Sequence, residues 1–275
     1  MKNNKLIIYD DNCPMCAVYT KAFVATGMIE KNNRKNFSTI DPEILHKLDI
    51  EKCRNEIPVI DPETAEIWYG IDAIVEILRS KMPWVKKTAG VPPIRWILNR
   101  TYKLISYNRR VIVAAETQPG NFDCTPDFNY KYRALFLLLC LLFNSVMLLP
   151  FHQNIFHASF INASFLQIQG AHALLVFLNV TTALSLERRL AFEYLGQVNM
   201  LALTVVLLMI PLMALNNFLP AKNSVFNNLY LILLLLVVYK EYKRRMNFAG
   251  IFKQQPGIVA ANVIGVTAFI CYLAW

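Results

Sequence analysis

The chain has 275 residues, a formal net charge of +9, 55% hydrophobic residues and a mean hydropathy of +0.35. It is more apolar than a soluble globular protein usually is, and it lacks a basic stripe with interleaved aromatic residues, so we predict no nucleic-acid partner. The apolar excess is uneven, because residues 1–130 are mixed and charged whereas residues 134–275 contain several long apolar runs. This contrast predicts a soluble domain at residues 1–113, a linker at 114–133 and a membrane domain at 134–275.

The N-terminal segment gives no sign of a secretory signal peptide. The basic start of the chain is followed by an apolar stretch that ends at Tyr9, which is too short for such a signal. We therefore expect the first domain to lie in the cytosol. In a reducing compartment, the six cysteines of the chain favour catalytic or metal-binding use over a structural disulfide framework.

The first domain reads as strands alternating with helices. Hydrophobic runs and turn signals predict a strand at 5–9, a helix at 13–28, a strand at 36–40, a helix that opens at Asp41-Pro42-Glu43, strands at 57–60 and 66–69, and a helix at 71–78. This order of elements is typical of an α/β thioredoxin-like fold.

The most informative motif is Cys13-Pro14-Met15-Cys16, which directly follows the first predicted strand. The spacing puts both sulfurs on one face of the next helix, close enough to pair as a disulfide. The free backbone amides at a helix start favour a thiolate, and Pro14 suits the first helical position. The motif predicts thiol–disulfide exchange.

Pro58 opens the strand after the second predicted helix. A thioredoxin-type fold places a cis-proline there, facing the dithiol, so we expect Pro58 to belong to the site. The alternative is an ordinary proline on an edge strand.

Three segments resemble one protein family. Tyr9-Asp10-Asp11-Asn12-Cys13-Pro14-Met15-Cys16 is similar to the Asp-x-x-Cys-x-x-Cys signature of the DCC family of thiol–disulfide oxidoreductases. The strand at 57–60 with Tyr69–Ile74 resembles its second block, and Tyr102–Arg109 resembles its closing segment. The resemblance covers about residues 5–113 and implies an activity class without a substrate. One departure is Asp11, where many members carry glycine.

For the dithiol, we expect Cys13 to attack a substrate disulfide and Cys16 to resolve the mixed disulfide. Two alternatives stay open. A metal site would need further ligands, for which Cys53, Cys124 and His46 are available without matching a second paired motif, and an inert site used for binding is also compatible with the sequence.

The side chains around the dithiol also allow two roles each. Asp10 could accept a proton from the resolving thiol, or it could cap the helix or order the loop. Asp72 is expected to cap its helix. Asn108 and Arg109 could reach back to an aspartate or to the active-site loop, or they could form an ordinary helix end. Cys124 lies in the turn-rich linker and is expected to be exposed.

In the second half, apolar runs predict five membrane spans, at about 134–151, 166–186, 194–215, 225–239 and 257–275. Basic residues alternate between the loops in a way that places the N-terminal domain in the cytosol and the C-terminus outside. A four-span arrangement, with one segment lying along the surface, is the alternative.

Together these features predict a thioredoxin-like domain followed by an all-α transmembrane bundle, in a membrane-anchored thiol–disulfide oxidoreductase of a bacterial inner membrane. Its expected partners are a protein or small-molecule disulfide substrate, a dithiol electron donor and the lipid bilayer, with no resident cofactor or metal. The alternative is a thioredoxin-like binding or redox-sensing module, one that could bind metal, that regulates a membrane bundle handling a lipid or small neutral substrate.

Overall fold

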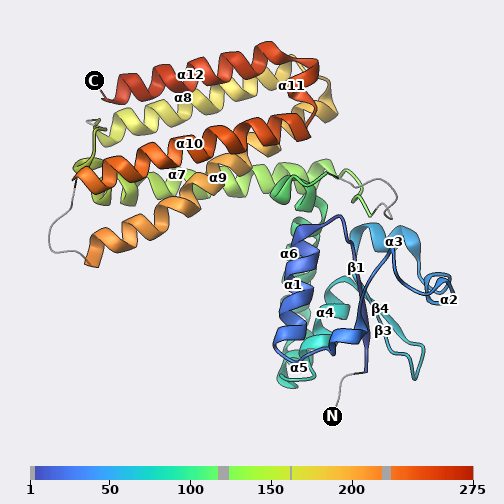
Figure 1. The fold of residues 1–275 in the computed structure, drawn as a ribbon. Helices are drawn as coiled ribbons and strands as arrows, with labels where there is room; N and C mark the ends of the chain where they lie inside the picture. The colour runs from blue at the N-terminus through green and yellow to red at the C-terminus, as the bar shows by residue number, and fades with distance from the viewer. Residues whose placement is uncertain (1–3, 117–123, 162, 219–223, 275) are drawn as a thin grey trace. The chain divides into compact units, whose positions relative to one another are not determined.

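The computed structural model describes residues 4–116, 124–161, 163–218 and 224–274 (Figure 1). It divides into two compact units, Met1–Arg133 and Ala134–Trp275. The first unit combines a small sheet with helices, and the second is helical.

The sheet of the first unit has four strands in the order β2-β1-β3-β4. They are β1 (Leu6–Tyr9), β2 (Arg34–Asn36), β3 (Pro58–Ile60) and β4 (Ile67–Tyr69). β1 runs parallel to β2 and antiparallel to β3, with Ile7 opposite Arg34 on one side and Val59 on the other, and β4 is antiparallel to β3. This mixed sheet confirms the predicted thioredoxin-like fold class.

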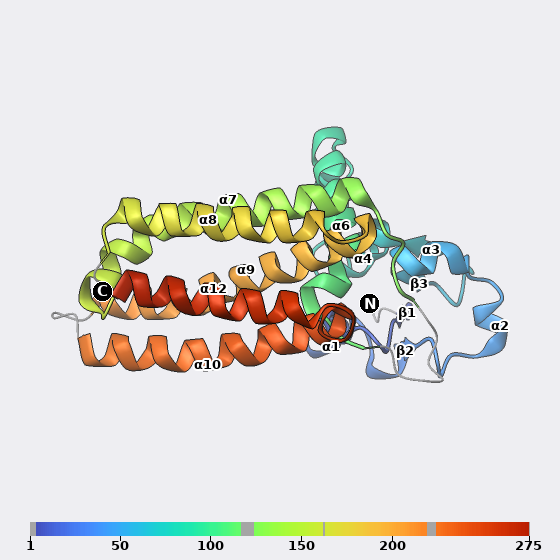
Figure 2. The same cartoon turned by 90° about the horizontal axis from the view of Figure 1, so that it is seen from above.

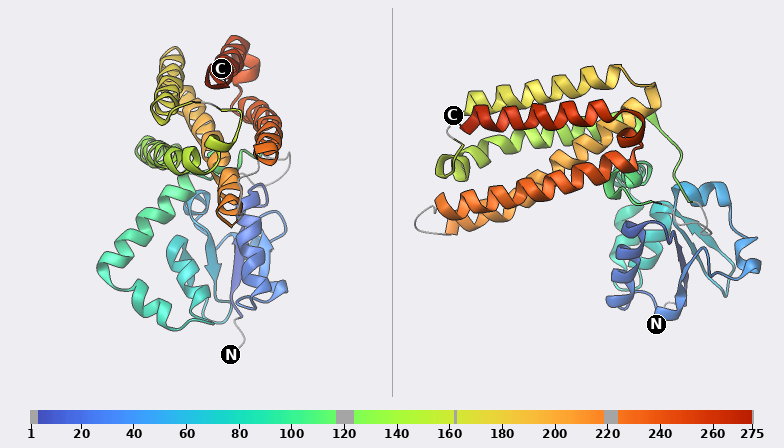
Figure 3. Two further views of the ribbon diagram at one scale, coloured as in Figure 1. Left: turned by 90° about the vertical axis from the view of Figure 1, so that its left-hand side faces the viewer. Right: turned by 45° about the horizontal axis from the view of Figure 1, so that its top comes forward.

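Helices cover both faces of the sheet (Figures 1 and 3). Ile7 packs in a cluster with Val59, Ala73 and residues of α1. Ile8 points to the opposite face and packs with Phe37 and residues around α3. Both faces of a strand buried in this way must be apolar, which is why β1 is an unbroken hydrophobic run. The helices of this unit are α1 (Pro14–Ala25), α2 (Pro42–Leu45), α3 (Ile50–Asn55), α4 (Gly70–Leu78), α5 (Trp84–Ala89) and α6 (Pro92–Val113), with a 3-10 turn at Lys31–Asn33.

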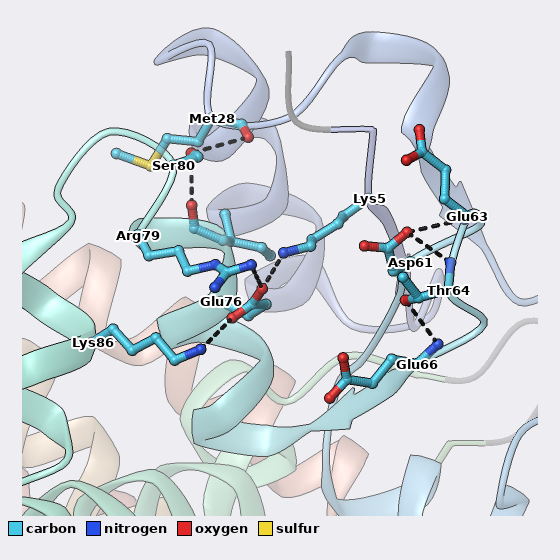
Figure 4. Close-up of polar contacts among 11 residues, drawn as sticks. Lys5, Met28, Asp61, Glu63, Thr64, Glu66, Glu76, Arg79, Ser80 and Lys86 are labelled. Atoms are coloured by element: carbon cyan, nitrogen blue, oxygen red, sulfur yellow. Dashed lines mark hydrogen bonds and ion pairs between the residues drawn. The ribbon is translucent and has the colours of Figure 1, made fainter. Parts of the chain in front are cut away.

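A buried carboxylate ties α4 to the first strand (Figure 4). The Glu76 side chain is only 3% exposed, and it forms ion pairs with Lys5, with Arg79 and, at 3.9 Å, with Lys86. Lys5 is itself buried and also lies over the Trp68 ring, 4.8 Å from its centroid. The cluster satisfies a charge that would otherwise be expensive to bury.

The strand predicted at 36–40 is wrong by several residues, because β2 ends at Asn36 and a turn follows. Phe37 and Ile40 are apolar because they pack in the core cluster around Ile8. They therefore look like strand residues in the sequence, although they lie in a turn. The polar strand itself pairs at the edge of the sheet, where alternation of polar and apolar residues is not required.

The second unit contains five helices that are long and apolar enough to cross a membrane, as predicted. They are the helical segments Tyr130–Ala158, Phe165–Leu184, Arg188–Phe218, Ser224–Phe248 and Pro256–Leu273. The first includes α7 (Tyr130–Asn154) and the turn Phe156–Ala158, and the others correspond to α8 (Phe165–Leu184), α9 (Arg188–Phe218), α10 (Ser224–Phe248) and α12 (Pro256–Ala274), with the short α11 (Ile251–Gln254) before the last. Figure 2 shows these long helices running alongside one another.

Polar side chains join four of these helices. The Tyr194 hydroxyl on α9 donates to Asn179 Oδ1 on α8 at 2.6 Å, and Asn262 Nδ2 on α12 donates to the Tyr194 and Tyr242 hydroxyls at 2.6 and 3.1 Å. Tyr242 belongs to α10. Hydrogen bonds of this kind hold helices together where lipid removes the usual hydrophobic driving force for their association.

Candidate dithiol site

The loop between β1 and α1 is organised by Asp10. Its carbonyl oxygen accepts a hydrogen bond from Cys13 N at 3.2 Å, and its Oδ1 accepts one from Asn12 N at 3.0 Å. Asp10 therefore orders the loop, while the N-cap position of α1 is taken by Cys13. Asp11, which departs from the family signature that this loop resembles, has no left-handed backbone: among the described non-glycine residues only Ala65 and Ala114 do. This loop does not require the freedom of glycine.

The two cysteines occupy the first turn of α1. Cys13 Sγ accepts a hydrogen bond from Cys16 N at 3.4 Å, and Pro14 stands where its missing N–H leaves no bond unmade. Both side chains are 4% exposed. Tyr19 lies three residues after Cys16 on the same helix face, and burial, together with the nearby Cys16, raises the pKa of its hydroxyl. The i, i+3 spacing could have indicated this neighbour from the sequence, but Tyr19 was not among the predicted site residues.

The two thiols have opposite acidities. The pKa of Cys13 is lowered from 9.0 to about 7, chiefly by a hydrogen bond from the Cys16 side chain. Burial opposes this shift, and the Arg109 charge supports it. The same hydrogen bond, together with burial, raises the pKa of Cys16 well above its ordinary value. Near neutral pH a large fraction of Cys13 is thus thiolate, whereas Cys16 stays protonated.

Arg109 reaches the site from α6 and forms a buried ion pair with Asp10, its Nη2 lying 3.4 Å from Asp10 Oδ2. The same Nη2 donates to the carbonyl oxygens of Arg54, at 2.9 Å, and Cys124. Burial is the largest influence on Asp10 and raises its carboxyl pKa, although the Arg109 charge opposes the rise. Of the two interpretations left open for Arg109, the contact with an aspartate is the one that the structure shows. Asn108 instead donates to the Leu104 and Tyr132 carbonyls and is a packing residue.

Pro58 is the first residue of β3 and is buried. Because Leu6 faces Ile60 and Ile7 faces Val59, the same register puts Pro58 level with Ile8, near the end of β1 from which the dithiol loop leaves. The described residues contain no cis peptide bond, so the bond before Pro58 is trans. The chain just before Pro58 is held on both sides, since Ile57 N donates to the Tyr102 hydroxyl and Ile57 O accepts from Gly70 N, each at 2.9 Å.

Cys124 is not exposed, contrary to the expectation for a turn-rich linker. It is 1% exposed and packs with Cys53 in the cluster around Ile8. The chain there is anchored by paired hydrogen bonds between Asn55 and Asp127, at 2.7 and 3.1 Å, and by the bond from Arg109. Burial raises the pKa of Cys53 to about 12 and raises that of Cys124 as well.

The metal alternative required ligands beyond the dithiol. Cys53 and Cys124 lie in an apolar cluster, and His46 is exposed at the end of α2. Within the part of the chain that the structure describes, no three His, Cys, Asp or Glu side chains are grouped so that they could hold a metal ion.

Asp72 does not cap α4, contrary to expectation. The N-cap position is Tyr69, without a side-chain bond, and Asp72 lies in the first turn, where its Oδ1 is 2.9 Å from Arg95 Nη2 on α6. The helix begins two residues before Asp72, so this carboxylate lies inside the first turn and pairs with the neighbouring helix instead. A pocket of about 410 Å³ lies beside this pair, with Glu56, Asp72, Arg95, Arg100, Tyr102 and Lys103 among its lining residues.

The mixed sheet and the dithiol at the start of α1 define a thioredoxin-like dithiol domain. Residues 7–114 match a family model described as DCC1-like thiol–disulfide oxidoreductase, and five long apolar helices follow this part of the chain. The match includes the dithiol, Pro58 and Arg109. Comparison with curated proteins and with solved structures finds no match for the chain.

Proposed function

We propose that the protein is a membrane-anchored thiol–disulfide oxidoreductase that exchanges disulfides through Cys13 and Cys16. The observation that carries the proposal is the pair of buried thiols in the first turn of α1, where Cys13 Sγ accepts a hydrogen bond from Cys16 N at 3.4 Å; the lowered pKa of Cys13 and the raised pKa of Cys16 agree with it. A thiolate is the nucleophile in disulfide exchange, and attack is most effective when its pKa lies near the ambient pH. The pKa of about 7 at Cys13 meets that condition.

In the proposed reaction, the Cys13 thiolate attacks one sulfur of a substrate disulfide, and the other substrate sulfur leaves as a thiolate. Cys16 then loses its proton and attacks the Cys13 sulfur of the mixed disulfide, which releases the second substrate thiolate. The substrate gains two electrons, and Cys13 and Cys16 become a disulfide. A second dithiol carrier returns the site to its reduced form.

Asp10 is proposed to accept the Cys16 proton. Because its pKa is raised, the Asp10 carboxylate binds a proton more readily than an ordinary carboxylate, which makes it a better base. Its negative charge also acts on Cys16, whose pKa it raises. Below the raised pKa the carboxyl is protonated and can no longer accept, so the resolving step slows as the pH falls. Arg109 is a positioning residue that holds Asp10, and Pro58 is proposed to shape the substrate side of the site.

The proposed location is the cytosolic side of a bacterial inner membrane, where reduction of a protein or small-molecule disulfide is the natural direction. The electron donor is then a cytosolic dithiol carrier. The five apolar helices support membrane anchoring, and the distribution of basic residues between them supports the orientation.

The test uses the purified full chain in lipid discs, equilibrated in glutathione buffers of graded poise and then alkylated, with Cys13 and Cys16 read by peptide mass spectrometry. We expect one two-electron transition that is lost in Cys13→Ser and unchanged in the matched control Cys53→Ser. A chain with no reversible transition at Cys13 and Cys16, or one that survives Cys13→Ser, would contradict the proposal.

The rival function is a binding or redox-sensing module that regulates the helical unit. The partly buried network around Tyr194 and Asn262 gives that unit polar chemistry of its own. The two functions separate by mutation, because Cys13→Ser abolishes exchange but leaves a purely scaffolding role intact.

A further inference from the structure

The segment from Lys81 to Lys103, which contains α5 and the first half of α6, differs in charge from the rest of the first unit. It contains six basic residues and no acidic residue. All six basic side chains are exposed. Carboxylates pair with only two of them among the described residues: Lys86 with Glu76 at 3.9 Å and Arg95 with Asp72 at 2.9 Å. The basic residues are Lys81, Lys86, Lys87, Arg95, Arg100 and Lys103.

The same segment exposes large apolar side chains. Trp84 and Trp96 are 63% and 62% exposed, and Ile97 and Val91 are 55% and 42% exposed. Of the seven large apolar side chains that the described part of the first unit exposes, these four lie within 14 residues of chain. The cluster is therefore not the scatter of single exposed side chains that any soluble surface shows.

The fold presents this segment outward. Figures 2 and 3 show α5 and the start of α6 forming a corner that projects from the sheet. Arg100 lies over the Trp96 ring at 5.6 Å, so a cation and an aromatic ring stand together on the exposed face of α6. We use the term α5–α6 face for the exposed side chains of residues 81–103.

We propose that the α5–α6 face binds the anionic phospholipid surface of the membrane that the same chain spans. Tryptophan side chains are enriched at the level of the lipid headgroups, because they have an apolar ring and a polar N–H. Exposed lysines and arginines are attracted by the negative potential of an anionic leaflet. Either feature alone would be weak, and their combination on one protruding corner is what an interfacial segment requires.

Lipid is favoured over an acidic protein partner by what the chain itself supplies. The five apolar helices would tether the first unit to a bilayer. The effective concentration of lipid surface around the α5–α6 face is then high, so even a weak affinity is enough for binding. The neighbouring pocket is not itself proposed as an anion site, because Glu56 and Asp72 line it beside the cations. The proposal concerns the open face.

The test uses the full chain in lipid discs, in which both sides of the bilayer are open to reagents. A water-soluble amine-acetylating reagent is applied to discs of phosphatidylcholine alone and to discs that also contain phosphatidylglycerol, and each lysine is followed by mass spectrometry. In the anionic discs we expect the acetylation of Lys86 and Lys87 to slow by about fivefold or more, and high salt to restore it. Lys35 and Lys47, exposed elsewhere on the first unit, are the internal controls and should change less than about twofold.

A second readout follows the tryptophans. Lipids brominated near the headgroup should quench more fluorescence in the wild type than in Trp84→Phe/Trp96→Phe, and Lys86→Glu/Lys87→Glu should lose this quenching while Lys35→Glu/Lys47→Glu keeps it. Equal acetylation of Lys86 and Lys87 in both lipids would overturn the proposal. Protection in both lipids and in detergent, with a doubled particle mass, would overturn it in favour of a second copy of the chain on this face.

Discussion

Cys13 and Cys16 have the same exposure and lie one helical turn apart, yet only one of them is acidic. The difference comes from the direction of the hydrogen bonds, because Cys13 accepts from both the Cys16 side chain and the Cys16 backbone amide. Their positions in the first turn of the helix thus give the two thiols different pKa values.

This asymmetry predicts the effect of removing the Cys16 donor. In Cys16→Ala the pKa of Cys13 should rise from about 7 toward 9.0, because only the backbone hydrogen bond is left. Its alkylation rate at neutral pH should fall by up to about tenfold. Cys16→Ser, which keeps a hydroxyl donor, is the matched control and should lie between the two. The measurement is the alkylation rate of Cys13 against pH, and an unchanged midpoint in Cys16→Ala would contradict the prediction.

The charges of Asp10 and Arg109 predict that removing one or the other shifts the pKa of Cys13 in opposite directions. Arg109→Gln should raise the pKa of Cys13, since the guanidinium charge favours the thiolate, whereas Asp10→Asn should lower it. Arg109→Gln also leaves a buried carboxylate unpaired, which should destabilise the unit by about 3–5 kcal/mol. Asp10→Asn/Arg109→Gln should recover part of that loss.

Stability of the first unit within the full chain can be followed by the alkylation of Cys53 during heating, because this thiol is buried and has a pKa of about 12. It should react only when the unit opens. Equal midpoints for wild type and Arg109→Gln would show that the ion pair does not hold the fold.

At the scale of elements, Glu76 connects α4 to β1 through Lys5 (Figure 4). Glu76→Ala should destabilise the first unit by about 3–5 kcal/mol, because it leaves the buried Lys5 without its partner. Glu76→Gln, which keeps the shape and can still accept a hydrogen bond, should lose less. The readout is again the temperature at which Cys53 becomes reactive.

Asp72→Asn provides the comparison for an exposed pair. Asp72 and Arg95 are 44% and 48% exposed, so water screens their attraction and the variant should lose no more than about 1 kcal/mol. If Asp72→Asn proved as damaging as Glu76→Ala, burial would not be what decides the effect of these carboxylates.

The elements that could be predicted from sequence are those whose pattern is local. β1, β3 and β4 are apolar runs bounded by turns, and α4 has apolar residues on one face. The dithiol follows from spacing alone. β2 was misplaced because its residues are polar and the apolar residues next to it belong to a turn.

What could not be predicted depends on contacts between distant parts of the chain. Asp72 lies inside the first turn of α4 and pairs with Arg95, 23 residues away, and the chain around the buried Cys124 is fixed by Arg109 and Asn55. Neither partner is visible in the local sequence. The same holds for Tyr102, whose hydroxyl binds Ile57 N from 45 residues away and so supports the chain beside Pro58.

At the scale of the whole molecule, the helical unit contains specific polar contacts between its helices, although its composition is strongly apolar. Arg245 on α10 is buried, donating to Gln197 Oε1 on α9 at 2.8 Å and pairing with Glu241 at 2.8 Å. Buried charges are retained in membrane helices only where they have such partners. These contacts and the network around Tyr194 involve α8, α9, α10 and α12, so they fix how those helices pack against each other.

The last prediction concerns how this unit crosses the bilayer. Arg188 and Arg189 lie at the start of α9, and Lys240, Lys243, Arg244, Arg245 and Lys253 lie around the end of α10 and in α11, whereas the segment 152–165 contains no lysine or arginine. Because basic residues collect on the cytosolic side of a membrane, we predict for five spans a cytosolic N-terminal unit and a C-terminus outside. The 18-residue segment Pro256–Leu273 decides between five and four spans, and it contains no charged residue, which favours insertion over lying at the surface.

A reporter that is active only outside the cytosol should therefore work when fused after residue 275 or inserted in the segment 152–165, and fail when inserted after residue 186. A reporter that folds only in the cytosol is the matched control and should give the opposite pattern at all three positions. Activity of the cytosolic reporter at the C-terminus, with the other two positions unchanged, would establish four spans. The C-terminal segment would then lie along the membrane surface, on the same side as the dithiol.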